Sequence, residues 1–165
     1  MSLAASKAEF AAWCTVSSPL TLSFDMSNTT LYNALFPIVT HPQALAINQA
    51  WAGSAGFLAK QSPDIWTGAV YHGSACEVSS VRTLPTWTVW AKPLPDKTVA
   101  AVAINTLNSS SVDVIVTPLE LGFDASVTHL TAVDVWTGEA VAVGSQWTIQ
   151  GLAPHESQFL ILKAG

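Results

Sequence analysis

The chain carries eleven acidic side chains, and one of them follows a strand-like segment directly. Asp25 comes immediately after Leu20–Phe24, in which apolar and small polar residues alternate as in a short strand. Such a carboxylate either caps the turn that follows or lines a ligand site at the end of the strand. The acidic residues of the second half are scattered, and we expect most of them to be solvated. They include Glu77, Asp113, Glu120, Asp124, Asp134, Glu139 and Glu156.

No other pattern in the sequence has the spacing of a metal, cofactor or nucleophile site. The sequence contains neither a glycine-rich phosphate loop nor a G-x-S-x-G turn, and its histidines are dispersed. We therefore expect no metal and no cofactor. The cysteines fit no zinc or redox motif, so Cys14 is either a buried free thiol or bonded to Cys76. The histidines are His41, His72, His129 and His155.

Composition argues against several classes of partner. Half of the 165 residues are apolar, 10% are charged and the net charge is −5, so a basic footprint for nucleic acid is absent. No polybasic run or apolar stretch of about 18 residues indicates a membrane, and the first residues lack the pattern of a signal peptide. The low charge fits a segment that belongs against other protein, or a self-contained β-rich domain.

The first third of the chain has the periodicity of helices around one short strand. Within Ala4–Thr15 apolar side chains recur at helical spacing, and Pro19 ends that helix. Leu20–Phe24 predicts the strand, Leu31–Phe36 a helical turn, and Pro42–Gln49 a second helix with proline at its first position. Because one strand cannot satisfy its own backbone groups laterally, this unit is not expected to stand alone.

The helical period disappears in the second part of the chain, where short β-branched and aromatic segments alternate with turn residues. Several short strands at this spacing predict an antiparallel β-sandwich. The predicted strands are Ile65–Tyr71, Cys76–Val81, Trp87–Trp90, Val99–Ile104, Val112–Val116, Val127–Trp136, Ala140–Val143, Gln146–Ile149 and Gln158–Leu162.

Short phrases in a fixed order connect these two parts. Each is weak alone, but together they resemble the end of the catalytic barrel and the C-terminal domain of family-27 glycoside hydrolases, the α-galactosidases or melibiases. The phrases are Ser18-Pro19-Leu20 leading to Asp25, Ala46-Ile47-Asn48-Gln49, Val89-Trp90-Ala91-Lys92-Pro93-Leu94, Val99–Asn105, Ala132–Trp136 and Leu152-Ala153-Pro154-His155.

The resemblance implies a mainly β fold, a Greek-key-like antiparallel β-sandwich preceded by a helix-strand-helix remnant of a (β/α)8 barrel. It divides the chain into residues 1–58, the last barrel unit, and residues 59–165, the sandwich. It also implies a parent enzyme that cleaves terminal α-galactosyl groups with retention. The sequence does not separate this activity from that of an α-N-acetylgalactosaminidase. The alternative is a non-catalytic module, either carbohydrate-binding or purely structural.

Retention requires two carboxyl groups about 5 to 5.5 Å apart. The family's K-x-D and D-D phrases have no counterpart in the sequence, so we assign no catalytic residue and expect the chain alone to be inactive. Asp25 remains a candidate for lining the sugar site. The expected partners are an α-galactoside, through the parent enzyme, and either a second copy or the missing barrel half, through exposed apolar surface. The seven tryptophans either stack on sugar or pack in the interior.

Two tripeptides have the pattern of N-glycosylation acceptors, and they begin at Asn28 and Asn108. With the secreted habit that the resemblance implies, they favour an extracytoplasmic protein, either secreted or in a lysosome or vacuole.

Overall fold

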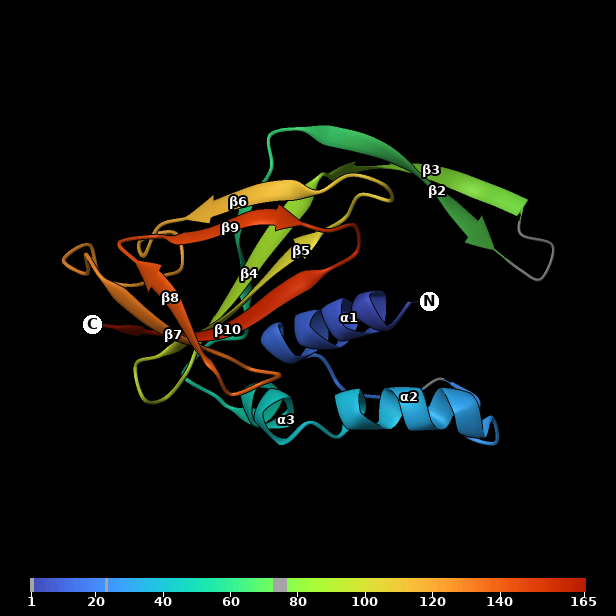
Figure 1. Cartoon of the computed structure of the whole chain (residues 1–165), viewed down its shortest axis with the longest axis horizontal. Coiled ribbons are helices and arrows are strands. Elements are labelled where there is room, and N and C mark those ends of the chain that lie inside the picture. Colours follow the sequence, from blue (N-terminus) through green and yellow to red (C-terminus); the bar gives the residue numbers. More distant parts are fainter. Residues whose placement is uncertain (1, 23, 73–76) are drawn as a thin grey trace.

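The computed structural model describes the backbone of residues 2–22, 24–72 and 77–165, and their side chains outside residues 69–80. A six-stranded antiparallel sheet forms the centre, with helices against one face and a two-stranded ribbon against the other (Figure 1). The elements are α1 (Leu3–Thr15), α2 (Thr29–Val39), α3 (Pro42–Gln49), β1 (Phe57–Gln61), β2 (Ile65–His72), β3 (Glu77–Pro85), β4 (Trp87–Pro93), β5 (Val99–Asn105), β6 (Val112–Val116), β7 (Leu130–Asp134), β8 (Ala140–Gly144), β9 (Trp147–Leu152) and β10 (Ser157–Ala164).

Each helix begins at a residue suited to its first turn. The Ser2 hydroxyl caps α1 by accepting a hydrogen bond from the amide of Ala5 at 3.1 Å. Asn28 caps α2 in the same way, because its Oδ1 accepts from the Leu31 amide at 3.0 Å. Pro42 occupies the first position of α3, where its missing N–H leaves nothing unpaired. In the described part of the chain, no helix is long and apolar enough to cross a membrane.

The sheet has the strand order β1-β4-β5-β10-β7-β8, so β10 lies between β5 and β7 although it comes last in the chain. Leu160 of β10 stands opposite Ala101 of β5 on one side and Asp134 of β7 on the other. The β6–β9 ribbon and the β2–β3 hairpin are separate two-stranded sheets.

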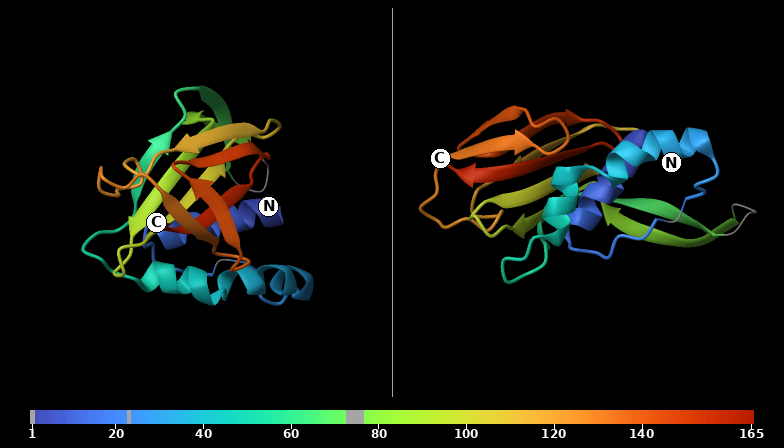
Figure 2. Two further views of the ribbon diagram at one scale, coloured as in Figure 1. Left: turned by 60° about the vertical axis from the view of Figure 1, so that its left-hand side comes forward. Right: turned by 90° about the horizontal axis from the view of Figure 1, so that it is seen from below.

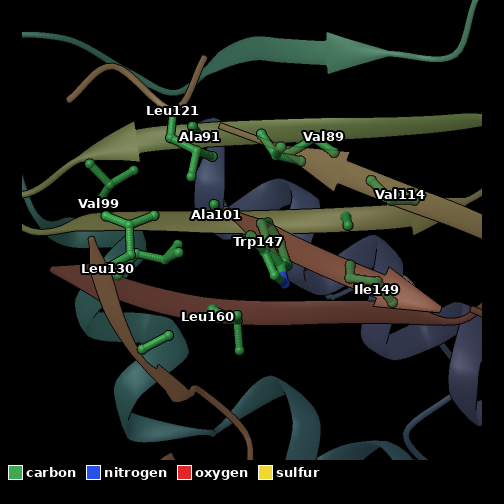
Figure 3. Packing of buried hydrophobic residues seen from close by; sticks show 14 of the residues in the cluster. Val89, Ala91, Val99, Ala101, Val114, Leu121, Leu130, Trp147, Ile149 and Leu160 are labelled. Atoms are coloured by element: carbon green, nitrogen blue, oxygen red, sulfur yellow. The ribbon is translucent and has the colours of Figure 1, made fainter. Parts of the chain in front are cut away.

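One face of the central sheet packs against the β6–β9 ribbon. Val89 and Leu160 of the sheet belong to the same buried cluster as Val114 and Trp147 of the ribbon (Figure 3). The indole of Trp147 is 1% exposed, and its Nε1 donates a hydrogen bond to Gln158 Oε1 at 2.7 Å. This cluster is the core of the β-sandwich.

The other face of the sheet packs against the helices. Val102 and Phe159 lie in a second buried cluster with Phe10 and Cys14 of α1 and Ile47 of α3. Strand β5 contributes to both clusters, and this explains why Val99–Ala103 is an uninterrupted run of buried apolar residues.

The β2–β3 hairpin extends away from the sheet as an arm (Figures 1 and 2). Two contacts hold its base: Trp66 Nε1 donates to Thr106 Oγ1, and the Thr86 amide donates to the Asp64 carbonyl, both at 3.0 Å. Further along the arm Val81 is 62% exposed, so its side chain lies in neither core.

The sequence predicted most of this architecture. In the part of the chain that the structure describes, strands outnumber helices and pair antiparallel, so the mainly β class with its antiparallel sandwich is confirmed. The helices predicted at 4–15 and 42–49 are confirmed. The helical turn predicted at 31–36 is part of the longer helix α2, and every strand predicted in the second part overlaps an observed strand. The division between residues 58 and 59 stays a prediction, since α1 and α3 share a core with the sheet.

Two elements differ from the prediction. The strand expected at Leu20–Phe24 is wrong for the described residues 20–22 and 24, which form no strand. This segment lies against α1 and α2 rather than beside another strand, so its backbone has no ladder to join. Conversely, β1 was not predicted, and it forms because residues 57–61 pair with β4.

Candidate functional site

Asp25 lies at the surface, in the loop ahead of α2. Its Oδ1 accepts hydrogen bonds from the Ser27 hydroxyl at 2.7 Å and the Ser27 amide at 2.9 Å. These bonds hold the pKa of the Asp25 carboxyl below its ordinary value, and the bond from the Ser27 side chain has the largest effect. The carboxylate is therefore ionised and occupied with its own turn, as in the capping interpretation.

Two other turns repeat the Asp25 geometry. Asp124 Oδ1 accepts from the Ser126 hydroxyl at 2.8 Å and amide at 2.9 Å, and Asp96 Oδ1 accepts from the hydroxyl and amide of Thr98. Both turns belong to loops of the sandwich. Because the same Asp-x-Ser/Thr contact recurs there, it needs no ligand to explain it at Asp25. A sugar-lining role for Asp25 stays a prediction.

Four carboxyl groups of the described residues have a lowered pKa, which is the opposite of what an acid catalyst needs. A general acid of a glycosidase needs a raised pKa to remain protonated near neutrality. Hydrogen bonds lower the pKa of Asp25, Asp96 and Asp124. At Glu120 burial acts to raise the pKa, but hydrogen bonds from Thr117 and the Lys60 ammonium outweigh it. None of these four groups has the protonation behaviour of a glycosidase acid.

The family-like phrases meet at the junction between helices and sheet. Asn48 Nδ2, in the Ile47-Asn48-Gln49 phrase, donates to the carbonyl of Ser18 at 2.9 Å and more weakly to that of Trp13 at 3.3 Å. It therefore closes the C-terminal end of α1 and fixes it to α3. The Ser18-Pro19-Leu20 phrase and the Asn48 phrase thus form one contact, although thirty residues separate them.

Lys92 completes this junction from the sheet. Its side chain is fully buried, and its Nζ donates hydrogen bonds to the carbonyls of Ile47 and, at 3.0 Å, Asn48. These carbonyls lie in the last turn of α3, where a cation interacts favourably with the helix dipole. Burial lowers the pKa of the Lys92 ammonium. Sequence analysis did not single out this role; the available signal was a lone lysine within the apolar strand segment Trp90-Ala91-Lys92.

Cys14 lies beside this junction as an inert thiol. It is fully buried, and burial raises the pKa of its thiol to about 12, although the nearby charge of Lys92 acts in the opposite direction. A thiol with this pKa is not a nucleophile at physiological pH. The disulfide alternative depends on Cys76, which lies outside the described residues.

An apolar cleft of about 120 Å³ opens between α1, α2 and the segment after Pro19. Phe10 and Trp13 line it from α1, Leu35 and Ile38 from α2, and Leu20 from the segment. Apolar side chains also remain exposed around it, with Leu22 at 49% and Phe36 at 44%. Of the residues of α2 only Ile38 is buried, so this helix leaves most of its apolar surface uncovered.

The remaining candidates are dispersed. His41 precedes α3 with its ring edge-on to Trp136, while His155 occupies a turn with a positive φ of 59°. In the part of the chain that the structure describes, no group of His, Cys, Asp and Glu could hold a metal. Asn28 and Asn108 are both exposed, and the Oδ1 of Asn28 is engaged in the α2 cap. Glycosylation at these positions stays a prediction.

The tryptophans divide between interior and surface. Trp147 is a core residue, Trp87 packs against the same core, and Trp90 and Trp136 pack against the helix-side cluster. Trp51 is 65% exposed. Packing therefore accounts for most of these rings, and the half-buried Trp136 also borders a groove that charged and hydroxyl groups line in part.

Residues 85–162 match the family described as "Alpha galactosidase C-terminal beta sandwich domain". No curated protein matches the sequence. The fold is similar to alpha-galactosidase I from Mortierella vinacea (16% identity, TM-score 0.73, covering all of this chain and 36% of that one). It is also similar to a family-27 β-L-arabinopyranosidase from Geobacillus stearothermophilus (16% identity, TM-score 0.72, covering 99% of this chain and 31% of that one). A third similar structure is a protein from Bacteroides fragilis assigned as an alpha-galactosidase/melibiase. Its sequence identity is 24% and its TM-score 0.72, and the match covers 99% of this chain and 29% of that one.

The fold thus defines a C-terminal β-sandwich with a helical unit fixed to one face, and its solved relatives are glycoside hydrolases. The chain contains, at residues 85–162, a domain of the alpha-galactosidase C-terminal β-sandwich family, and this confirms the resemblance seen in the sequence phrases. The chain spans about a third of the length of these relatives.

Proposed function

We propose that this chain is the C-terminal portion of an α-galactosidase-like retaining glycoside hydrolase, whose catalytic carboxylate pair lies outside these 165 residues. The parent enzyme would cleave terminal α-galactosyl groups through a covalent glycosyl-enzyme intermediate. The observation that carries the proposal is the junction: Asn48 and Lys92 fix the helical unit to a sandwich of the α-galactosidase family.

The open surface of the helical unit supports the same proposal. The cleft beside α2 and the exposed Leu22, Leu31 and Phe36 form an apolar face that this chain leaves uncovered. Such a face fits further barrel elements packed against α1 and α2, as expected for the end of a (β/α)8 barrel. The fixed junction would then hold the sandwich in one orientation relative to that barrel.

Two assays test the proposal. The purified chain, verified by intact mass, should not hydrolyse 4-nitrophenyl α-galactoside above the buffer rate. The coding sequence on the 5′ side should supply K-x-D and D-D segments, and the extended protein should release galactose with retained anomeric configuration, as followed by NMR. An upstream frame without these segments, or turnover by the chain alone, would contradict the proposal. Parallel assays with the α-N-acetylgalactosaminide distinguish the two neighbouring activities.

The second candidate function is a non-catalytic carbohydrate-binding module. The specific observation in its favour is a groove beside Trp136 with a mixed polar and apolar lining, where both hydrogen-bond donors and acceptors lie near an indole ring.

A further inference from the structure

A groove of about 430 Å³ lies between the first turns of α1, the turn that joins β7 to β8, and the start of β10. It differs from the cleft beside α2, because charged and hydroxyl groups line it together with the apolar Leu3 and Ala4. Helix α1 lies alongside β10 in both Figure 1 and Figure 2, so the groove follows a seam between the helices and the sheet. The lining side chains with chemistry are Lys7, Asp134, Trp136, Thr137, Glu156 and Ser157.

The Trp136 ring is held in a fixed position. Phe159 packs against it with ring centroids 5.9 Å apart, and His41 meets it edge-on at 5.2 Å. Its backbone is fixed as well, because the amides of Trp136 and Thr137 each donate to Asp134 Oδ1 at 2.9 Å. A half-buried indole held in this way is a preorganised platform. The Lys7 ammonium lies over the ring at 5.7 Å from its centroid, so it must move aside when a ligand stacks on that face.

The polar groups around this platform retain hydrogen-bonding capacity. Within the described part of the chain, the Glu156 carboxylate, the Ser157 hydroxyl and the Lys7 ammonium make no hydrogen bond with other protein groups. Asp134 uses only Oδ1 for the turn, and its Oδ2 stays available as an acceptor. The groove therefore offers an ammonium donor, two carboxylate acceptors and a hydroxyl of either character.

This combination favours a ligand that has both hydroxyl groups and an apolar face. A purely anionic ligand would meet Asp134 and Glu156, and an apolar one would leave both carboxylates and Lys7 desolvated without partners. A neutral pyranose matches all the groups, since its C–H face stacks on an indole while its hydroxyls donate to carboxylates and accept from an ammonium. The volume, about 430 Å³, also lies within the range of small-ligand pockets.

We propose that this groove is a carbohydrate-binding site for a neutral hexopyranose, in which Trp136 provides the stacking surface and Lys7, Asp134 and Glu156 bind the hydroxyls. The inference deepens the second candidate function above and rests on it, but it is independent of the hydrolase proposal, because binding here needs no catalytic carboxylate. One partly covered ring and a few hydrogen bonds predict a dissociation constant on the order of 1 mM.

The test is an NMR titration of the ¹⁵N-labelled chain with methyl α-D-galactopyranoside, with the methyl α-glucoside, methyl α-mannoside and glycerol in parallel. We expect a saturable shift of the Trp136 indole N–H and of the Thr137 amide with at least one glycoside. The indole of Trp51 is the internal control, because it is 65% exposed and does not line the groove. It should not move.

Variants at exposed positions keep the test independent of folding. Lys7→Ala and Glu156→Gln should each weaken binding about tenfold with an unchanged melting temperature, whereas Trp51→Ala should bind as the unmodified chain does. The absence of a saturable shift at Trp136 overturns the proposal. So do equal shifts with glycerol, shifts confined to other tryptophans, or full affinity in both groove variants.

Discussion

The two faces of the central sheet are covered in different ways. The β6–β9 ribbon closes one face so completely that Val114, Val116 and Trp147 are each at most 1% exposed. On the helix face α1 is well buried, but α2 buries only Ile38 and leaves Phe36 44% exposed. The same sheet therefore carries one finished core and one layer whose outer helix is uncovered.

This difference shows where the many apolar residues of this weakly charged chain lie. On the ribbon face, apolar residues are interior, and they need nothing further to cover them. On the helix face they extend beyond α1 to the cleft and to the surface of α2, as a contact surface would. Stability should therefore depend strongly on the ribbon, moderately on the junction, and little on the outer side of α2.

The largest effect is expected for Trp147→Ala, which opens a cavity in the finished core and leaves Gln158 without its hydrogen-bond donor. We expect the free energy of unfolding to fall by about 3–5 kcal/mol in urea denaturation. Trp51→Ala is the matched control, because Trp51 is 65% exposed, and it should change stability by less than about 0.5 kcal/mol. Similar losses in the two variants would mean that the ribbon face is not the finished core described above.

Lys92→Met tests the junction. The substitution keeps most of the side-chain volume but removes the donor for the carbonyls of Ile47 and Asn48, so a loss of about 1–3 kcal/mol is expected. Hydrogen exchange should locate the loss in α3. Lys60→Met is the control, because the Lys60–Glu120 ion pair is partly exposed and should contribute less than about 1 kcal/mol. Unchanged exchange in α3 would refute the capping role of Lys92.

Phe36→Gln tests the uncovered helix. Phe36 packs on Tyr32 with ring centroids 5.0 Å apart but is otherwise outside both cores, so stability should fall by less than about 1 kcal/mol. The same variant should reduce any self-association that analytical ultracentrifugation detects at high concentration. A loss near that of Trp147→Ala would show that α2 belongs to a finished core after all.

The smallest expected effect is a pH dependence at Lys92. Burial lowers the pKa of this ammonium below 10.5, and a Cys14 thiolate, which forms only at higher pH, acts in the opposite direction. Between the lowered native pKa and 10.5 the unfolded chain holds more protons than the native one, so the contribution of Lys92 to stability rises with pH. Urea titrations from about pH 8 to 10 should show this rise in the unmodified chain but not in Lys92→Met. Parallel curves for the two proteins would exclude it.

The elements that could be predicted from the sequence are those with strong local signals. Helix α1 contains no glycine or proline and has Pro19 beyond its end, and β5 is an apolar run typical of a strand buried on both faces. Element β1 has no such signal: Phe57–Gln61 becomes a strand through its pairing with β4, with a bulge between Leu58 and Lys60. The segment Leu20–Phe24 is the opposite case. Its apolar and polar residues alternate as in a strand, but it has no neighbouring strand with which to pair, so its described residues form no strand.

The candidate site follows the same rule: its local contacts could be predicted from the sequence and its long-range contacts could not. The capping role of Asp25 follows from its Asp-x-Ser pattern, which local geometry determines. The junction was not predictable, because Asn48 and Lys92 reach carbonyls thirty to forty-five residues away. Likewise, nothing in the spacing of Lys7, Trp136 and Glu156 brings them to one groove; the packing of α1 beside β10 does so.

The position of β10 also limits when the protein can fold during its synthesis. This strand lies inside the sheet and supplies Leu160 to one core and Phe159 to the other. While residues 157–164 are still in the ribosomal tunnel, β5 and β7 have no strand between them, and α1 lacks part of its packing surface. The nascent chain therefore exposes apolar strand edges until translation has passed β10, and chaperones are most needed in that interval.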